Sequence, residues 1–184
     1  MKYFILIFLV MISLQSSVSQ DMELYSNEQN EVEWDKERKL IWEDFKGTPP
    51  SISETNAAAS TRCGFDVSAE SNDNKELIAV TIKNIFYCDK SWVRPDKRNR
   101  SDLLEHEQAH FDLCEVYARR LRRRVLDSNQ KLDIDKAIYE VFDAFKQRQK
   151  LYDKETNHSR NKEKQVEWLI TIADELLELS SFKK

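Results

Sequence analysis

The sequence is short of four residue types, and these shortages exclude several kinds of protein. Among 184 residues there are two glycines, three prolines, three cysteines and three histidines. Two glycines are too few for glycine-rich phosphate loops or for a β-sandwich with many tight turns. Charged residues make up 34% of the chain and hydrophobic residues 40%, a balance that excludes disorder and multiple membrane spans. The length suits one domain that folds on its own.

The longest apolar run lies at the start of the chain. Lys2 supplies a short basic stretch, and residues 3–14 are almost entirely apolar. This run is too short to span a bilayer comfortably, which takes about 20 residues, and the small residues Ser17 and Ser19 follow it. We therefore expect a signal peptide over residues 1–19, with an uncleaved N-terminal anchor as the alternative. The mature protein is then exported and has no stable membrane insertion.

After the signal, the chain predicts a flexible segment and then two strands. Residues 20–37 are polar and acidic with little periodicity, and we expect them to form a flexible lead-in. Strands are predicted at Ala57–Glu70 and Glu76–Cys88, because apolar and polar residues alternate in the second run and the turn-forming residues 71–75 separate the two. Together they predict a small antiparallel sheet.

Three helices are predicted after the strands. They run from Leu103 to about Asp127, from Asp133 to Leu151 and from Asn161 to Leu179. None of the three contains glycine or proline, and apolar residues recur every three or four positions. A sheet followed by helices predicts an α+β fold, with residues 38–184 as a single domain.

The three cysteines allow one disulfide at most within a monomer. Cys63 and Cys88 flank the predicted hairpin, and an oxidising compartment permits a bridge between them. The simplest hairpin register does not place them opposite each other, so the sequence does not decide whether this bridge forms. Cys114 lies on the apolar stripe of the first helix and is expected to be a small buried residue.

The sequence His-Glu-Gln-Ala-His at residues 106–110 carries the clearest chemistry. On a helix, His106 and His110 project from one face about one turn apart, so both rings can reach one metal ion. Zn²⁺ binds neutral imidazole nitrogen, and Glu107 would sit beside the metal, where a general base can take a proton from water. The alternative is a pair of core histidines without a metal, which does not explain the glutamate between them.

A catalytic zinc needs a third protein ligand. The two acidic residues that follow His110 on the same helix point away from the histidine face. The remaining histidine, His158, lies in a predicted loop over residues 152–159, and folding of this loop onto the first helix would bring all three histidines to one ion. Glu155 and Asp153 are the next candidates, and an exposed His158 without a ligand role is the plain alternative.

Further motifs accompany the paired histidines. They are Trp42–Phe45 with Gly47 and Pro49, Ala57–Thr61, Ser91-Trp92, Leu104–Asp112, Ala118–Leu121, and Tyr152–His158 followed by Gln165 and Trp168. In order and spacing they resemble one bacterial family, the domain of unknown function 922, whose members are regarded as secreted zinc-dependent metallopeptidases. The resemblance covers nearly the whole mature chain.

The resemblance implies a zincin-like fold, zinc as cofactor, peptide-bond hydrolysis and a periplasmic or secreted location. It assigns His106 and His110 as metal ligands, Glu107 as general base and His158 as third ligand. The family has glycine directly after this last histidine, where the present chain has Ser159.

Two other features have competing interpretations. Tyr117 and Tyr152 could donate a hydrogen bond to the developing oxyanion, and core packing is the alternative for both. Of the two, Tyr152 is the candidate catalytic residue, since it lies close to the predicted third ligand. The five arginines of residues 119–124 could bind nucleic acid. Because the chain is acidic overall and exported, we expect a solvated helix face and no nucleic-acid partner.

These observations predict an exported zinc metallopeptidase that acts on a peptide or protein substrate, with an edge strand aligning the substrate. Two hypotheses of other classes remain. One is a zinc-binding protein without catalysis, in which the metal only stabilises helix packing. The other is a helical interaction module of the cell envelope that needs no metal. The oligomeric state is not predicted.

Overall fold

The computed structural model describes residues 30–73, 77–128 and 132–183. The predicted signal peptide over residues 1–19 lies outside the described residues, as do residues 20–29 of the predicted lead-in. Within the described part of the chain, no helix is both long and apolar enough to cross a bilayer.

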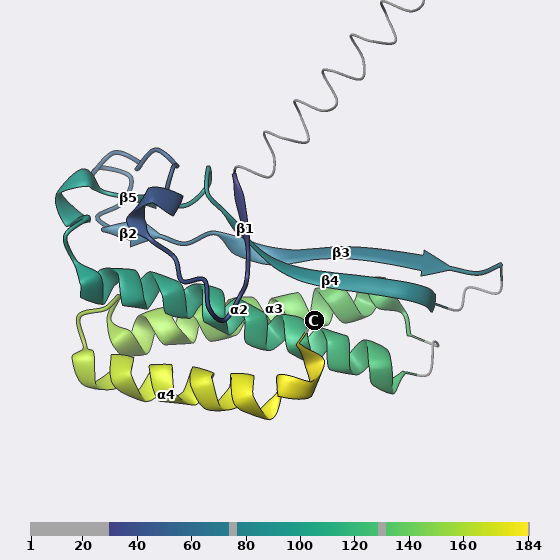
Figure 1. The fold of residues 1–184 in the computed structure, drawn as a ribbon. Helices are drawn as coiled ribbons and strands as arrows, with labels where there is room; N and C mark the ends of the chain where they lie inside the picture. Colours follow the sequence, from purple (N-terminus) through teal and green to yellow (C-terminus); the bar gives the residue numbers. More distant parts are fainter. Residues whose placement is uncertain (1–29, 74–76, 129–131, 184) are drawn as a thin grey trace, which may run out of the picture.

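A three-stranded antiparallel sheet forms the upper layer of the molecule (Figure 1). Its central strand, β4 (Leu77–Tyr87), pairs with β3 (Cys63–Ser71) on one side and with β1 (Glu31–Glu33) on the other. The long β3–β4 hairpin was predicted, although its first strand was expected to begin earlier. The end of the predicted flexible lead-in instead supplies β1, where Val32 pairs with Phe86.

A second, two-stranded sheet lies beside the first and consists of β2 (Ala59–Ser60) and β5 (Trp92–Val93). The run predicted as one strand over residues 57–70 is therefore two strands, β2 and β3, with different partners. A short 3-10 helix, η1 (Trp42–Asp44), packs its Trp42 and the following Phe45 into the apolar cluster under these strands.

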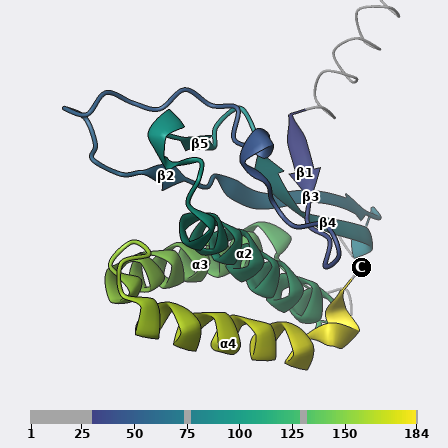
Figure 2. The ribbon, with the colours of Figure 1, turned by 60° about the vertical axis from the view of Figure 1, so that its left-hand side comes forward.

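Helices α2 (Ser101–Asp127), α3 (Ile134–Thr156) and α4 (Lys162–Glu178) cover the lower face of the sheets. Figures 1 and 2 show α2 between the strands above it and the other two helices. The short turns η2 (Pro95–Lys97) and η3 (Ser180–Phe182) precede α2 and follow α4. The observed order of small antiparallel sheets and three helices confirms the predicted α+β fold.

Helix α2 supplies buried residues to each of three apolar clusters in the described part of the chain. Leu113 and Val116 pack between α3 and α4, Phe111 packs under the strands, and Leu121 packs against α3 and β4. Cys114 is completely buried on this helix, as predicted. All three cysteines are free.

The arginines of residues 119–124 are bound to acidic side chains. Glu115, only 3% exposed, accepts hydrogen bonds from Arg119 Nε at 2.9 Å and Arg122 Nη1 at 2.8 Å. Arg122 also donates to the carbonyl oxygen of Ile82, which ties α2 to β4. The other three arginines pair with Glu175, Asp127 and Glu140. The basic run therefore holds the helix within the fold.

Replacing the buried Glu115 with alanine should destabilise the protein by about 3–5 kcal/mol, because two largely buried guanidinium groups would lose their partner. Urea unfolding of the wild type and Glu115→Ala gives this difference. Asp127→Ala, which breaks an exposed pair with Arg123, serves as the matched control and should change stability by less than about 1 kcal/mol. Equal losses in the two variants would contradict a structural role for the buried network.

Candidate metal centre

Two histidines of α2 and one aspartate of α3 form a group that can hold a metal ion. His106 and His110 lie one turn apart on α2, so both rings project toward α3. Asp153 approaches from α3, and its Oδ1 lies 3.3 Å from His106 Nε2 and 3.2 Å from His110 Nε2. The ligand atoms of the three residues all lie within 4.8 Å of one another. The predicted pairing of the two histidines on one helix face is therefore present.

The third member of this group comes from a helix, where a loop was predicted. Helix α3 was expected to end at Leu151, but it continues to Thr156 and carries Asp153. No glycine or proline interrupts these residues, and Thr156 Oγ1 donates to the carbonyl oxygen of Tyr152 at 2.7 Å within the helix. Glu155, the other acidic candidate, instead accepts a hydrogen bond from Trp168 Nε1 at 2.8 Å.

His158 lies beside the group, on the surface. Its side chain is 68% exposed, and its Nδ1 lies 3.2 Å from Asp153 Oδ1. All three histidines of the protein therefore approach one carboxylate oxygen. His158 is not part of the three-residue group, however, and its expected role as third ligand stays a prediction.

The turn that carries His158 has an unusual backbone. Asn157, His158 and Ser159 have φ values of 49°, 51° and 70°, in the left-handed region that favours glycine. Asn157 ends α3 in this conformation, and its backbone N–H donates to carbonyl oxygens of the last helical turn. Ser159, like its two neighbours, has a φ value that glycine adopts without strain. The tight turn returns the chain to the start of α4.

Each of the two helix histidines is oriented by a glutamine. His106 Nδ1 lies 2.9 Å from Gln165 Oε1, and His110 Nδ1 makes a hydrogen bond with Gln149 Oε1. An amide oxygen can only accept, so the proton of each neutral ring belongs on Nδ1. In the neutral form that binds a metal, the lone pair of each Nε2 then faces Asp153.

Neither glutamine was predicted as a functional residue. Gln149 lies four residues before Asp153 on α3, and this helical spacing could have placed it on the same face. Gln149 also donates through Nε2 to the carbonyl oxygen of His110 at 3.0 Å, so it holds both the ring and the backbone of that residue. Gln165 comes from α4, and its contact with His106 depends on helix packing that no local pattern reveals.

Tyr152 is completely buried and lies behind His106. The two rings stack with centroids 4.6 Å apart, and the hydroxyl group lies 3.0 Å from Gln165 Oε1 and 3.3 Å from the carbonyl oxygen of His106. The hydroxyl therefore has its partners inside the core, and Tyr152 does not line the cavity described below. This geometry favours a role in positioning His106 over the expected oxyanion donation. Tyr117, the weaker candidate, is buried in the core.

Glu107 is the one buried group at the site that lacks a complete set of partners. The residue is 3% exposed, and its Oε2 has no hydrogen-bond partner among the described residues. A buried carboxylate oxygen without a donor is strongly unfavourable unless a bound group satisfies it. Glu107 thus lies where a general base next to a metal ion is expected, and one of its carboxylate oxygens is free to accept a proton.

A cavity of about 640 Å³ opens above His106, Glu107 and His110. One wall consists of residues 55–63, which include β2, and the other consists of α3 from Phe142 to Asp153. Thr61 Oγ1 donates to the carbonyl oxygen of Glu107 at 3.2 Å, which fixes the β2 wall to the histidine helix. The candidate centre therefore lies on the floor of a cleft between a strand and a helix.

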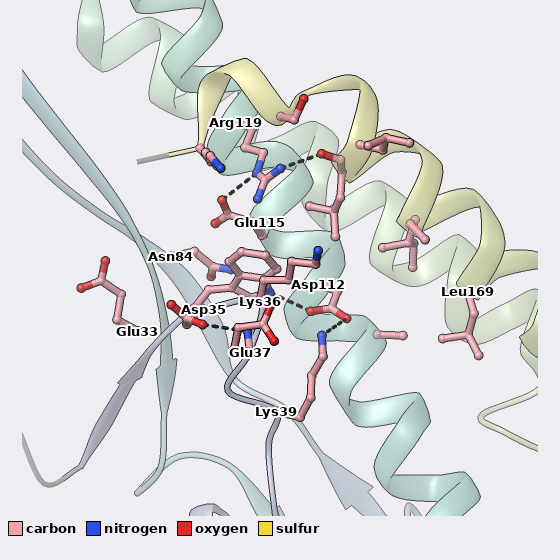
Figure 3. Close-up of a pocket in the computed structure, with 18 of the residues that line it drawn as sticks. Glu33, Asp35, Lys36, Glu37, Lys39, Asn84, Asp112, Glu115, Arg119 and Leu169 are labelled. Atoms are coloured by element: carbon pink, nitrogen blue, oxygen red, sulfur yellow. Dashed lines mark hydrogen bonds and ion pairs between the residues drawn. The ribbon is translucent and has the colours of Figure 1, made fainter.

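A larger cavity, of about 820 Å³, lies on another face of α2, between α4 and residues 33–39 (Figure 3). Several of its charged side chains are bound within the cavity wall. Asp112 accepts a hydrogen bond from Trp34 Nε1 at 2.7 Å and lies 3.6 Å from Lys39 Nζ, while Arg119 binds Glu115. The metal-ligand group found among the described residues lies in the other cavity, which we therefore take as the candidate site.

His110 and Asp153 shift each other's pKa. Burial alone would lower the pKa of His110, but the hydrogen bond and charge of Asp153 outweigh it and raise this pKa to about 9. Burial alone would raise the pKa of Asp153, but the hydrogen bonds from His106 and His110 hold it well below its usual range. A metal ion must therefore displace a proton from His110 when it binds.

In protein stripped of metal by a chelator, we expect the His110 ring to titrate near pH 9. Asp153→Asn removes the charge but keeps the burial, so the His110 pKa should fall well below 9. NMR titration of ¹⁵N-labelled imidazoles measures both midpoints, and Asp143→Asn, farther along α3, is the matched control. A His110 midpoint near 6.5 in the wild type would contradict the ion pair. Metal affinity should correspondingly rise with pH up to about 9 and level off above it.

Comparison with known proteins identifies one family. The model of a bacterial protein family of unknown function, DUF922, matches residues 41–159. This range covers η1, all of α2 with its paired histidines, and α3 with Asp153. No curated protein and no solved structure matches the chain. Since the matched range covers more than half of the sequence, the chain belongs to the bacterial DUF922 family, whose function is unknown.

Proposed function

We propose that this protein is an exported zinc-dependent peptidase. The single observation that carries the proposal is the buried Glu107, which lines the cleft beside His106, His110 and Asp153 and has a carboxylate oxygen with no hydrogen-bond partner among the described residues. Export rests on the predicted signal peptide, and periplasmic or secreted location on the family resemblance.

The residues present fit a catalytic zinc ion. Two imidazoles and one carboxylate are a ligand set that Zn²⁺ uses in open sites, and the glutamine contacts already fix both rings with Nε2 toward the group. We propose His106, His110 and Asp153 as the ligands. Bound there, Zn²⁺ would make a water molecule more acidic and polarise the carbonyl group of a peptide bond.

Glu107 performs the proton transfers in this proposal. Its free oxygen accepts the proton of the attacking water, and the same carboxyl group then returns a proton to the leaving amine. Burial strengthens the hydrogen bonds that the carboxylate can make, because little water competes for it. Thr61 and Gln149 keep the histidine helix in place through its backbone carbonyl oxygens.

The cleft suits an extended peptide. Strand β2 pairs with β5 on one side only, so its other edge is available to pair with a substrate strand. Residues 55–63 line the cleft along this edge, opposite α3. Main-chain hydrogen bonds to β2 would place a peptide bond over Glu107.

Glu107→Gln should bind zinc in the same stoichiometry as the wild type but hydrolyse peptides about 10²–10⁴-fold more slowly, because the amide cannot accept the proton. Metal analysis and cleavage of a mixed peptide library measure the two effects. Glu105→Gln, an exposed change on the same helix, is the matched control and should keep full activity. Full activity of zinc-loaded Glu107→Gln would overturn the mechanism. Zinc binding by a wild type that cuts no peptide would favour the non-catalytic zinc protein.

The third ligand is tested by two alanine variants. Asp153→Ala should lower zinc affinity by more than about 100-fold, since it removes a ligand. His158→Ala should lower zinc affinity by about tenfold or less, because His158 lies beside the ligands without being one. Competition with a chromophoric chelator gives both affinities. If His158→Ala loses zinc and Asp153→Ala retains it, the third ligand is His158, as the sequence and the resemblance predict.

A further inference from the structure

The cleft above the candidate centre has a basic rim, although the chain as a whole has a formal net charge of −4. Five cationic side chains line it: Arg62, Arg100, Lys146, Lys150 and Arg160. The acidic residues that line it are Glu107 and Asp153, both of which belong to the centre itself. The rim therefore carries a positive charge that the cleft does not neutralise.

Three of the five rim cations have no partner within the described part of the chain. Arg62, Lys150 and Arg160 are exposed and form neither an ion pair nor a side-chain hydrogen bond there. Lys146 lies 3.6 Å from Asp143, a pair that is about half exposed and therefore weak. By contrast, Arg119 and Arg122 are both bound to Glu115. Three positive charges at the cleft therefore have no acidic partner among the described residues.

Arg100 is the other rim cation that has an acidic partner. It pairs with Asp102 at 2.6 Å, and Asp102 also binds Lys162. Two cations share this one carboxylate, so its charge does not balance both. Arg100 also reaches Ser159, next to His158, and so lies at the end of the cleft formed by the turn between α3 and α4.

The distances of the rim lysines from Asp153 along α3 match the spacing of residues in an extended peptide. Lys150 and Lys146 precede Asp153 by three and seven positions on α3, which corresponds to about 5 Å and about 10 Å along the helix axis. An extended chain advances about 3.3 Å per residue, so these lysines would face side chains one to three residues from the reacting bond. Arg62 belongs to the β2 wall, on the opposite side of the cleft.

An acidic peptide fits this surface better than a nucleic acid does. The cations surround a cleft that contains a free strand edge, which supplies main-chain hydrogen bonds to a peptide and none to a phosphodiester chain. Two aromatic residues of the cleft, Phe142 and Trp92, already receive a cation over the ring, Lys146 at 5.4 Å and Arg94 at 5.6 Å, so that ring face is not free to stack on a base.

We propose that the cleft selects peptides that carry aspartate or glutamate within about three residues of the bond that is cut. This inference rests on the proposed peptidase function. Lys150 and Lys146 are its specificity-determining residues on α3, with Arg62 on the β2 wall and Arg100 and Arg160 at the end of the cleft.

The test uses the full zinc-loaded protein and a matched set of peptides that differ only by Glu, Gln or Lys at one position near the cleaved bond. We expect kcat/KM to be about tenfold higher for Glu than for Gln at low salt, and the ratio to fall as salt screens the charges. Lys150→Glu should reduce the preference for Glu over Lys about tenfold. Lys136→Glu, an exposed change at the other end of α3, is the matched control and should leave the preference unchanged.

Binding of the same peptides to Glu107→Gln separates this inference from the proposed activity. Preferential binding of the Glu peptide, without cleavage by the wild type, would support the charge selection and overturn the peptidase. Cleavage of the Glu, Gln and Lys peptides at equal rates would overturn the charge selection and leave the peptidase standing. Tighter binding of a single-stranded oligonucleotide than of the acidic peptide would also overturn the inference.

Discussion

The structure depends on one constraint, which is that helix α2 is buried on nearly every side while carrying charged and polar side chains. Each such group needs a partner inside the protein, because an unpaired buried polar group is costly. Glu115 and Arg119 satisfy each other, and His106 is held by Gln165. The carboxylate of Glu107 is the exception on this helix, since one of its oxygens has no partner among the described residues. The unsatisfied group and the metal-ligand group occupy the same cleft, which is why we assign the chemistry there.

The surrounding elements fix this helix in both position and rotation. Thr61 and Asn84, on the strand side, donate to the backbone carbonyl oxygens of Glu107 and Phe111. Gln149 donates to the carbonyl oxygen of His110 from α3. A rotation of α2 would break these contacts and would also move the imidazoles away from Asp153. The small sheet thus serves the site by holding the histidine helix, and its β2 edge forms a wall of the cleft.

The parts of the site that sequence could predict are those set by spacing within one element. His106 and His110 are four residues apart on a strongly helical run, so their common face follows from helix geometry. The extension of α3 to Thr156 was missed because a run of polar residues without glycine or proline suits a helix end and a loop alike. That error placed Asp153 in a loop and ranked it behind His158. The contact of Gln165 with His106 could not be predicted for a different reason, since only the packing of α4 brings the two residues together.

Anomalous diffraction at the zinc absorption edge, from crystals grown with Zn²⁺, tests the metal centre most directly. The account predicts one ion bonded to Nε2 of His106, Nε2 of His110 and the carboxylate of Asp153, with the free oxygen of Glu107 facing the open side of the ion. No ion at this position, or an ion bound only to groups elsewhere on the protein, would contradict it.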